Sequence, residues 1–428
     1  MQLLSLYPAG VIDYGKTILL IIRFGFHSTG NVYRAPAVIK QLPVFSHYAM
    51  SSEITEAEQN LDALLPAKRL TTSPPAELIN AAKAWADIVW DEAGQLGPMP
   101  LSDETLTSGH DLAAHPVFIF GVHRSGTTLV RNILDGHPDL VVLPSEGTYY
   151  TNLEAKLKTL PEHERLAFLG KEWLRRLANP INQPPYWLLG RSTDKNSTYI
   201  DFARYLMAWW AVLKQNENTQ WPHTAVVLAY ASCTNNISAK FWVDKTPVNE
   251  RYIKRIWREM PSAQIIHVVR DPVSILASRK KMEPGVSLRG VLRDMKMSFT
   301  VAAEYAADPR LMLVRYEELC DDPQKTIKQL ASFLHIDEPD ILNRATVAGL
   351  PAQTNSSFDN GDHPPGQILK ARQRQQPDTL SNTEQQFLKA YISKAAAKLN
   401  YPVEHIGLLH KYYFILRYCF FVLIDNKD

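Results

Sequence analysis

Short apolar runs alternate with stretches of helical periodicity from Val117 onward. The apolar runs predict strands at Val117–Phe120, Leu140–Leu143, Phe241–Val243, Ala263–Val269 and Leu311–Arg315. Helices are expected from Leu129 and from Pro272, and over Glu250–Met260, Leu288–Ala307, Pro323–Leu334 and Thr383–Leu399. This alternation favours an α/β fold, in which a parallel sheet is flanked by helices on both faces.

The first part of the chain has a different pattern. Two helical segments, Ser52–Leu65 and Pro75–Gly94, are separated by proline-rich and polar residues, and Leu96–Ala114 has so little periodicity that a linker is expected. We therefore divide the chain into an N-terminal helical accessory region (1–113), a core domain (114–403) and an apolar, aromatic C-terminal tail (404–428). Within the core domain, residues 151–240 form a long, aromatic-rich helical insertion.

Composition and cysteine usage narrow the class of protein. A hydrophobic fraction of 45% is that of an ordinary globular chain, and a net charge of +2 gives no reason to expect a nucleic-acid partner. The three cysteines, Cys233, Cys320 and Cys419, are too widely spaced to suggest a disulfide framework or a thiolate metal site. A reducing, cytoplasmic location is therefore expected.

The tail leaves one alternative open. Gly407–Ile424 is apolar and aromatic, but Lys411 and Arg417 interrupt it. Such a stretch is expected either to pack as a helix on the protein body or to lie as a peripheral helix in a membrane interface, rather than to span a bilayer.

A glycine loop carries the first chemical signal. The strand Val117–Phe120 runs into Gly121-Val-His-Arg-Ser-Gly-Thr-Thr128, which opens a helix. In this order, backbone N–H groups and the positive end of the helix dipole face an anion. The expected contacts come from Arg124, Ser125, Gly126, Thr127 and Thr128. Because Thr127 stands where a nucleoside triphosphatase has Lys, an ordinary ATPase or GTPase is disfavoured.

A second anion site is predicted after the strand Ala263–Val269. Arg270 lies at the carboxyl end of that strand, where open α/β sheets bind ligands. Asp271 and Pro272 are good starting residues for a helix, and Ser278 lies about two turns into it, on a face that can look back toward Arg270. A guanidinium with a nearby hydroxyl is suited to a phosphate group.

The two segments together resemble a known family. HRSGTTL and VVRDPVSILASRKKM look like the 5′-phosphosulfate loop and the 3′-phosphate site of sulfotransferases that use 3′-phosphoadenosine-5′-phosphosulfate (PAPS), in which an Arg and a Ser eight residues apart correspond to Arg270 and Ser278. WVDKTPVN (Trp242–Asn249) and LVRYEELCDDPQKTIKQLASFLHI (Leu313–Ile336) resemble bacterial and tyrosylprotein-like members. The resemblance covers about Pro116 to Pro402 and is patchy between Thr151 and Lys240. It implies PAPS as co-substrate, a hydroxyl acceptor and no metal.

The resemblance also suggests cations for the transfer step. Arg124 stands where tyrosylprotein-like members have Arg and cytosolic members have Lys, and it suits the charge that develops on the transferring group. Lys245 has a counterpart on the leaving-group side of the donor. The alternative for Lys245 is a surface lysine paired with Asp244.

Glu146 is the candidate base, because it follows the second strand and matches the Glu of tyrosylprotein-type members. We expect it to be partly desolvated, with a raised pKa that suits proton transfer from an alcohol or phenol. His123 is a second candidate base; it departs from the residues that relatives have before the arginine. His137 is expected to be structural.

The acceptor stays open among a glycan, a lipid, a small phenolic molecule and a peptide tyrosine. The polar segment Asn355–Gln376 is expected to form a flap whose Ser356, Ser357, Lys370 and Arg372 could close on the donor. A P-loop kinase of a small metabolite and a non-catalytic, membrane-associated binding protein of the same fold are the alternatives to a sulfotransferase.

Overall fold

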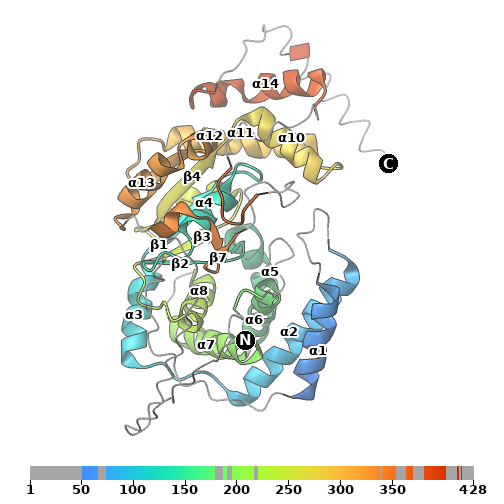
Figure 1. Ribbon diagram of the computed structural model, residues 1–428, viewed down its shortest axis with the longest axis vertical. Coiled ribbons are helices and arrows are strands. Elements are labelled where there is room, and N and C mark those ends of the chain that lie inside the picture. The colour runs from blue at the N-terminus through green and yellow to red at the C-terminus, as the bar shows by residue number, and fades with distance from the viewer. Residues whose placement is uncertain are drawn as a thin grey trace, which may run out of the picture. The chain divides into compact units, whose positions relative to one another are not determined.

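Five parallel strands form the central sheet in the computed structural model (Figure 1). They are β1 (Pro116–Phe120), β2 (Leu140–Val142), β3 (Phe241–Lys245), β4 (Gln264–Val269) and β5 (Leu311–Arg315). Their order is β2-β3-β1-β4-β5, so β3, β1 and β4 are interior; Val117 of β1 is level with Val243 of β3 on one side and with Gln264 of β4 on the other. All five strands predicted from apolar runs are confirmed, because strands covered on both faces need continuous apolar sequence.

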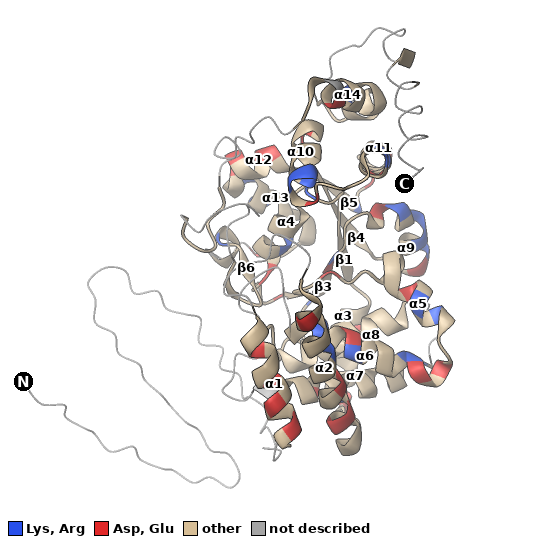
Figure 2. Ribbon diagram, turned by 90° about the vertical axis from the view of Figure 1, so that its right-hand side faces the viewer, with Lys and Arg blue, Asp and Glu red and all other residues tan. Residues whose placement is uncertain are grey.

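Helices cover both faces of this sheet. Figure 2 shows α4 (Thr127–Leu134) and α13 (Pro323–Leu334) on one side, and α9 (Ile253–Glu259) and α11 (Leu288–Glu304) on the other. The connections from β1 through α4 to β2 and from β3 through α9 to β4 run in opposite directions along the sheet, which places their helices on opposite faces. The predicted α/β class is therefore confirmed. A short antiparallel pair, β6 (Thr346–Val347) and β7 (Leu350–Pro351), follows α13 and η3 (Asp340–Asn343).

The accessory helices and the insertion share one core. The helices are α1 (Ser52–Leu64), α2 (Ala76–Leu96), α3 (Asp103–Ala113), η1 (Tyr149–Leu153), α5 (Glu154–Thr159), α6 (Glu162–Ala178), α7 (Lys195–Leu213) and α8 (Trp221–Cys233). The buried Trp85 of α2 meets Tyr199 of α7 edge-on, with ring centroids 4.9 Å apart. The predicted linker is wrong at α3, which Ser102 caps through the N–H of Thr105. Its cap and acidic first turn start this helix, although its apolar periodicity is weak.

The remaining elements complete the core beside β4 and β5. They are η2 (Asn249–Tyr252), α10 (Pro272–Met282), α12 (Tyr316–Asp321) and α14 (Asn382–Ala397). Asp271 caps α10 by accepting a hydrogen bond from the N–H of Ser274 at 2.7 Å, as its sequence predicts. Helix α14 packs on α10 and α11 through a second apolar cluster that includes Phe299 and Leu388.

The structure describes residues 51–65, 74–178, 187–189, 195–215, 220–337, 340–352, 363–369 and 380–401, together with 412, 413 and 416. Contacts divide the chain into Met1–Phe45 and Ser46–Asp428, and all described residues lie in the second unit. The expected flap contacts Ser356, Ser357, Lys370 and Arg372, and almost all of the tail, lie outside the described residues. Among the helices described, none is both long and apolar enough to cross a bilayer.

Candidate active site

The glycine loop after β1 is shaped by two glycines. Gly121 and Gly126 have φ values of 138° and 106°, which favour residues without a Cβ. A Cβ on Gly121 would lie 2.6 Å from the carbonyl oxygen of Val268, and one on Gly126 would lie 2.2 Å from the Tyr316 ring. The loop can therefore pass close to β4 and to Tyr316 only with glycine at both positions.

Several hydrogen-bond donors lie where this loop meets α4. The helix begins at Thr127, two residues before the predicted start, so the N–H groups of Thr127 and Thr128 lie in its first turn, where helix geometry provides no acceptor. The hydroxyl of Ser125 is fully buried and has no hydrogen-bond partner within the described part of the chain. An orphaned buried donor beside a helix N-terminus fits an anion that accepts several hydrogen bonds.

The second predicted anion site lies against the first. Nη1 of Arg270 donates to the carbonyl oxygen of Arg124 at 3.0 Å, and Nε of Arg124 donates to Oγ of Ser278 at 2.9 Å. The guanidinium of Arg270 lies over the Tyr316 ring, 4.6 Å from its centroid, and burial lowers the pKa of Arg270. Arg124, Arg270 and Ser278, predicted from two distant motifs, are thus brought together at the carboxyl ends of β1 and β4.

Glu146 and Lys245 form an ion pair at the ends of β2 and β3. Nζ of Lys245 lies 2.5 Å from Oε1 of Glu146, and the side chains are 4% and 40% exposed. Burial raises the pKa of Glu146, but the charge of Lys245 and its hydrogen bond together lower it by more, so the net shift is downward. The predicted raised pKa is therefore wrong for this pair. Lys245 is buried and pairs with Glu146, so the alternative of a surface lysine paired with Asp244 is wrong.

Asp244 and Thr246, on either side of Lys245, hold the loop that carries Glu146. Oδ1 of Asp244 accepts from the N–H of Gly147 at 2.9 Å, and Oγ1 of Thr246 accepts from the N–H of Thr148 at 2.9 Å. All three side chains of the Asp-Lys-Thr segment are thus directed at one short loop. Sequence reasoning missed Asp244 and Thr246, although their position beside Lys245 in the DKTP motif was a usable signal.

The two histidines of the loop region have different surroundings. His123 reaches the surface, but the protein around its ring removes part of its water; this desolvation lowers its pKa by more than the charge of Glu146 raises it. His123 is therefore within electrostatic reach of the candidate base. His137 is buried, and its Nδ1 accepts from the N–H of Asp139 at 3.0 Å, as expected of a structural residue.

A buried carboxyl group supports the start of the glycine loop. Oε2 of Glu250 accepts from the N–H of Gly121 at 3.3 Å, and the N–H of Val248 donates to the carbonyl of Gly121 at 3.1 Å. Burial raises the pKa of Glu250, and hydrogen bonds from Ser298 and Gly121 offset only part of this shift, so the net change is upward. The segment after Lys245 thus bonds to both the N–H and the carbonyl group of Gly121, which fixes the start of the glycine loop relative to β3.

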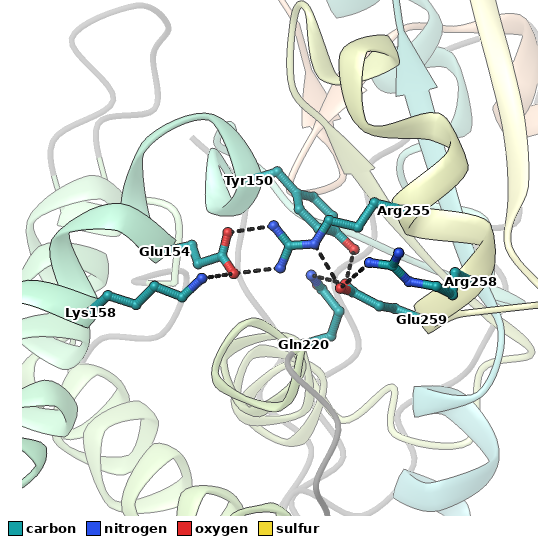
Figure 3. A network of polar contacts seen from close by, with 7 residues as sticks. All are labelled: Tyr150, Glu154, Lys158, Gln220, Arg255, Arg258 and Glu259. Atoms are coloured by element: carbon teal, nitrogen blue, oxygen red, sulfur yellow. Dashed lines mark hydrogen bonds and ion pairs between the residues drawn. The ribbon is translucent and has the colours of Figure 1, made fainter.

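A polar network anchors the insertion beside this site (Figure 3). Arg255 of α9 makes a two-pronged pair with Glu154 of α5, at 2.7 and 2.5 Å, and also donates to Glu259 at 2.7 Å. The hydroxyl of Tyr150 donates to Glu259 at 2.9 Å. The hydrogen bonds of Arg255 hold the pKa of Glu154 at about 2 despite burial. This network fixes the chain just after the Glu146 loop to α9.

A known family matches the part of the chain that contains these site residues. The model of the sulfotransferase family matches residues 116–340, more than half of the chain. No curated protein matches the chain.

Solved sulfotransferase structures match as well. The sulfotransferase domain from the curacin biosynthetic pathway is 18% identical, with a TM-score of 0.39, and the match covers 68% of this chain and 99% of that one. The sulfotransferase domain from the Synechococcus PCC 7002 olefin synthase is 18% identical, with a TM-score of 0.33 and coverage of 71% and 94%. Sulfotransferase STF9 from Mycobacterium avium is 16% identical, with a TM-score of 0.35 and coverage of 68% and 81%.

Proposed function

The chain belongs to the sulfotransferase family, and we propose that it transfers a sulfuryl group from PAPS to a hydroxyl group of an acceptor. The observation that carries the donor assignment is the contact between the two anion motifs. Arg270 bonds to the backbone of Arg124, while Arg124 bonds to Ser278. One ligand with two separated anionic groups would satisfy both motifs at once.

The residues present fit such a donor. Residues 124–128, with the orphaned Ser125 hydroxyl and the first turn of α4, would hold its 5′-phosphosulfate, and Arg270 and Ser278 would hold its 3′-phosphate. The donor would supply an activated sulfuryl group. Arg124 is partly buried between these two sets of contacts and carries the positive charge that a departing phosphate needs.

Glu146 is proposed to accept the proton of the acceptor hydroxyl, with Lys245 beside it as the second cation. The ion pair keeps Glu146 ionised, but a carboxylate held by an ammonium is a weak base. Lys245 could also bind an anionic oxygen of the donor, and sharing its charge in this way would weaken its hold on Glu146 and raise the pKa of that carboxyl group. Glu146 would then be a stronger base in the complex with donor than in the free enzyme, which favours proton transfer in the complete complex.

The acceptor class is proposed as a hydroxyl compound, either a glycan, a lipid or a small molecule. A panel of such compounds, incubated with PAPS carrying radiolabelled sulfate, tests the proposed reaction. We expect label to appear on at least one hydroxyl acceptor, and PAPS to be required. Transfer of labelled phosphate from ATP and Mg²⁺, with no transfer from PAPS, would instead support the kinase alternative and reject the proposal.

A further inference from the structure

Arg176 of α6 reaches from the insertion to the loop that carries Glu146. Its Nη1 donates to the carbonyl oxygens of Glu146 and Gly147 at 2.7 and 3.3 Å, and its Nη2 donates to Oγ1 of Thr148 at 3.0 Å. One guanidinium thus contacts three consecutive residues of the loop. Arg176 bonds to carbonyl groups of the loop, whereas Asp244 and Thr246, at the end of β3 and just after it, accept from its backbone N–H groups.

Arg176 is itself fixed in place. Its Nε donates to Oε1 of Glu172 at 2.9 Å, its guanidinium lies over the Trp173 ring at 5.3 Å, and its side chain is only 14% exposed. A planar group held on one edge and one face loses little further freedom when it bonds to the loop. The contact is therefore a rigid support, in contrast to a flexible surface arginine.

The loop needs such support because its backbone is strained. Thr148 has a φ of 52°, in the left-handed region that β-branched residues rarely adopt. A residue of this kind keeps its conformation only when surrounding contacts hold it there. Arg176 bonds to the side chain of Thr148 and to the two preceding carbonyls, so it holds groups of the loop that Asp244 and Thr246 do not contact.

We propose that Arg176 is a positioning residue for Glu146, through which the insertion helix α6 sets the place of the catalytic carboxylate. The proposal rests on the proposed function, because it assumes that Glu146 acts as the base. Arg176 touches the backbone of Glu146 and not its carboxylate, which pairs with Lys245. Its effect should therefore fall on turnover and depend on the Glu146 side chain, while donor binding at Arg270 and Ser278 is left intact.

The neighbouring arginine offers a matched control. Arg175 also pairs with Glu172, at 2.5 Å, and is partly buried, but none of its described contacts is with the loop. We expect Arg176→Met to lower kcat by about 100-fold, the effect of a displacement of roughly 1 Å at a reacting group. The KM for PAPS should change less than threefold, and Arg175→Met should behave like the wild type. Arg176→Lys, which keeps the charge and can reach one carbonyl, should give an intermediate kcat and serves if Arg176→Met does not fold.

A double-mutant cycle separates positioning from general destabilisation. If Arg176 acts through Glu146, adding Arg176→Met to Glu146→Gln should lower the residual rate by less than twofold. Equal turnover for Arg176→Met (or Arg176→Lys) and the wild type, or losses that multiply fully in the double variant, would overturn the inference. A Glu146→Gln variant that keeps full activity would instead refute Glu146 as the base, so the two failures are distinguishable.

Discussion

Glu146→Gln is expected to lower kcat by about 100-fold to 10,000-fold, the usual contribution of a general base. Gln keeps the shape of the side chain and can still accept a hydrogen bond from Lys245, but it cannot accept the proton of the acceptor hydroxyl. In the free wild-type enzyme, Lys245 lowers the pKa of Glu146 more than burial raises it. The carboxylate of the free enzyme is therefore ionised above a value that lies below the ordinary 4.5, and kcat/KM for PAPS should fall only as the pH drops through that lowered value. The acidic limb of kcat/KM should be missing from Glu146→Gln.

A surface pair provides the control for this substitution. Glu162 also pairs with a lysine, Lys214, but its side chain is 63% exposed and lies at the start of α6, at the other end of that helix from Arg176. Glu162→Gln should leave kcat unchanged. If Glu146→Gln retained more than a third of wild-type turnover, the base would have to be sought elsewhere, first at His123, which lies within electrostatic reach of Glu146.

Lys245→Met should lower kcat by about 100-fold to 1,000-fold, which is typical when one preorganised positive or hydrogen-bonding group is removed from a site of developing charge. Met is similar to Lys in length, so the packing around this buried side chain is largely retained. The substitution also removes the strongest lowering influence on Glu146, while burial still raises its pKa. The acidic limb of kcat/KM should therefore move to higher pH than in the wild type.

Lys240 is the matched control for Lys245. It precedes β3, pairs with Asp139 at 2.8 Å and is 57% exposed. Lys240→Met should leave both kcat and the pH profile unchanged, because an exposed pair of this kind contributes little. A Lys245→Met enzyme whose acidic limb stays in the wild-type position would show that Lys245 does not set the protonation of Glu146.

Much of the sheet and its ligand edge could be predicted from the sequence. Strands buried on both faces have continuous apolar sequences, so the apolar runs of β1 and β4 were sufficient to predict these strands. Once these strands are parallel neighbours, their carboxyl ends meet at one edge, and Arg124, Arg270 and Ser278 follow from the residues after each strand. The two anion motifs could therefore be predicted because each directly follows a recognisable strand.

Other features depend on tertiary contacts that no local pattern encodes. The separation of Glu146 and Lys245 is set by the register of β2 with β3, and it turned an expected raised pKa into a lowered one. Arg176 lies 30 residues from Glu146 on an ordinary amphipathic helix, and its contact with the loop has no sequence signal. Glu250 looks like one more charged residue of a helix until burial against Gly121 gives it a role.

Isothermal titration of the protein with 3′,5′-ADP and with 5′-AMP tests most directly whether both anion motifs hold one donor. The wild type should bind 3′,5′-ADP about 10-fold to 100-fold more tightly, since the 3′-phosphate gains charged hydrogen bonds from Arg270 and Ser278. Arg270→Met should remove that preference. The control is Arg310→Met, which should keep it: Arg310 also stacks on an aromatic ring, but it directly precedes β5 and so lies at the amino ends of the parallel strands, away from the anion motifs. Equal affinity of the wild type for the two nucleotides, or a preference that survives Arg270→Met, would contradict a shared donor site.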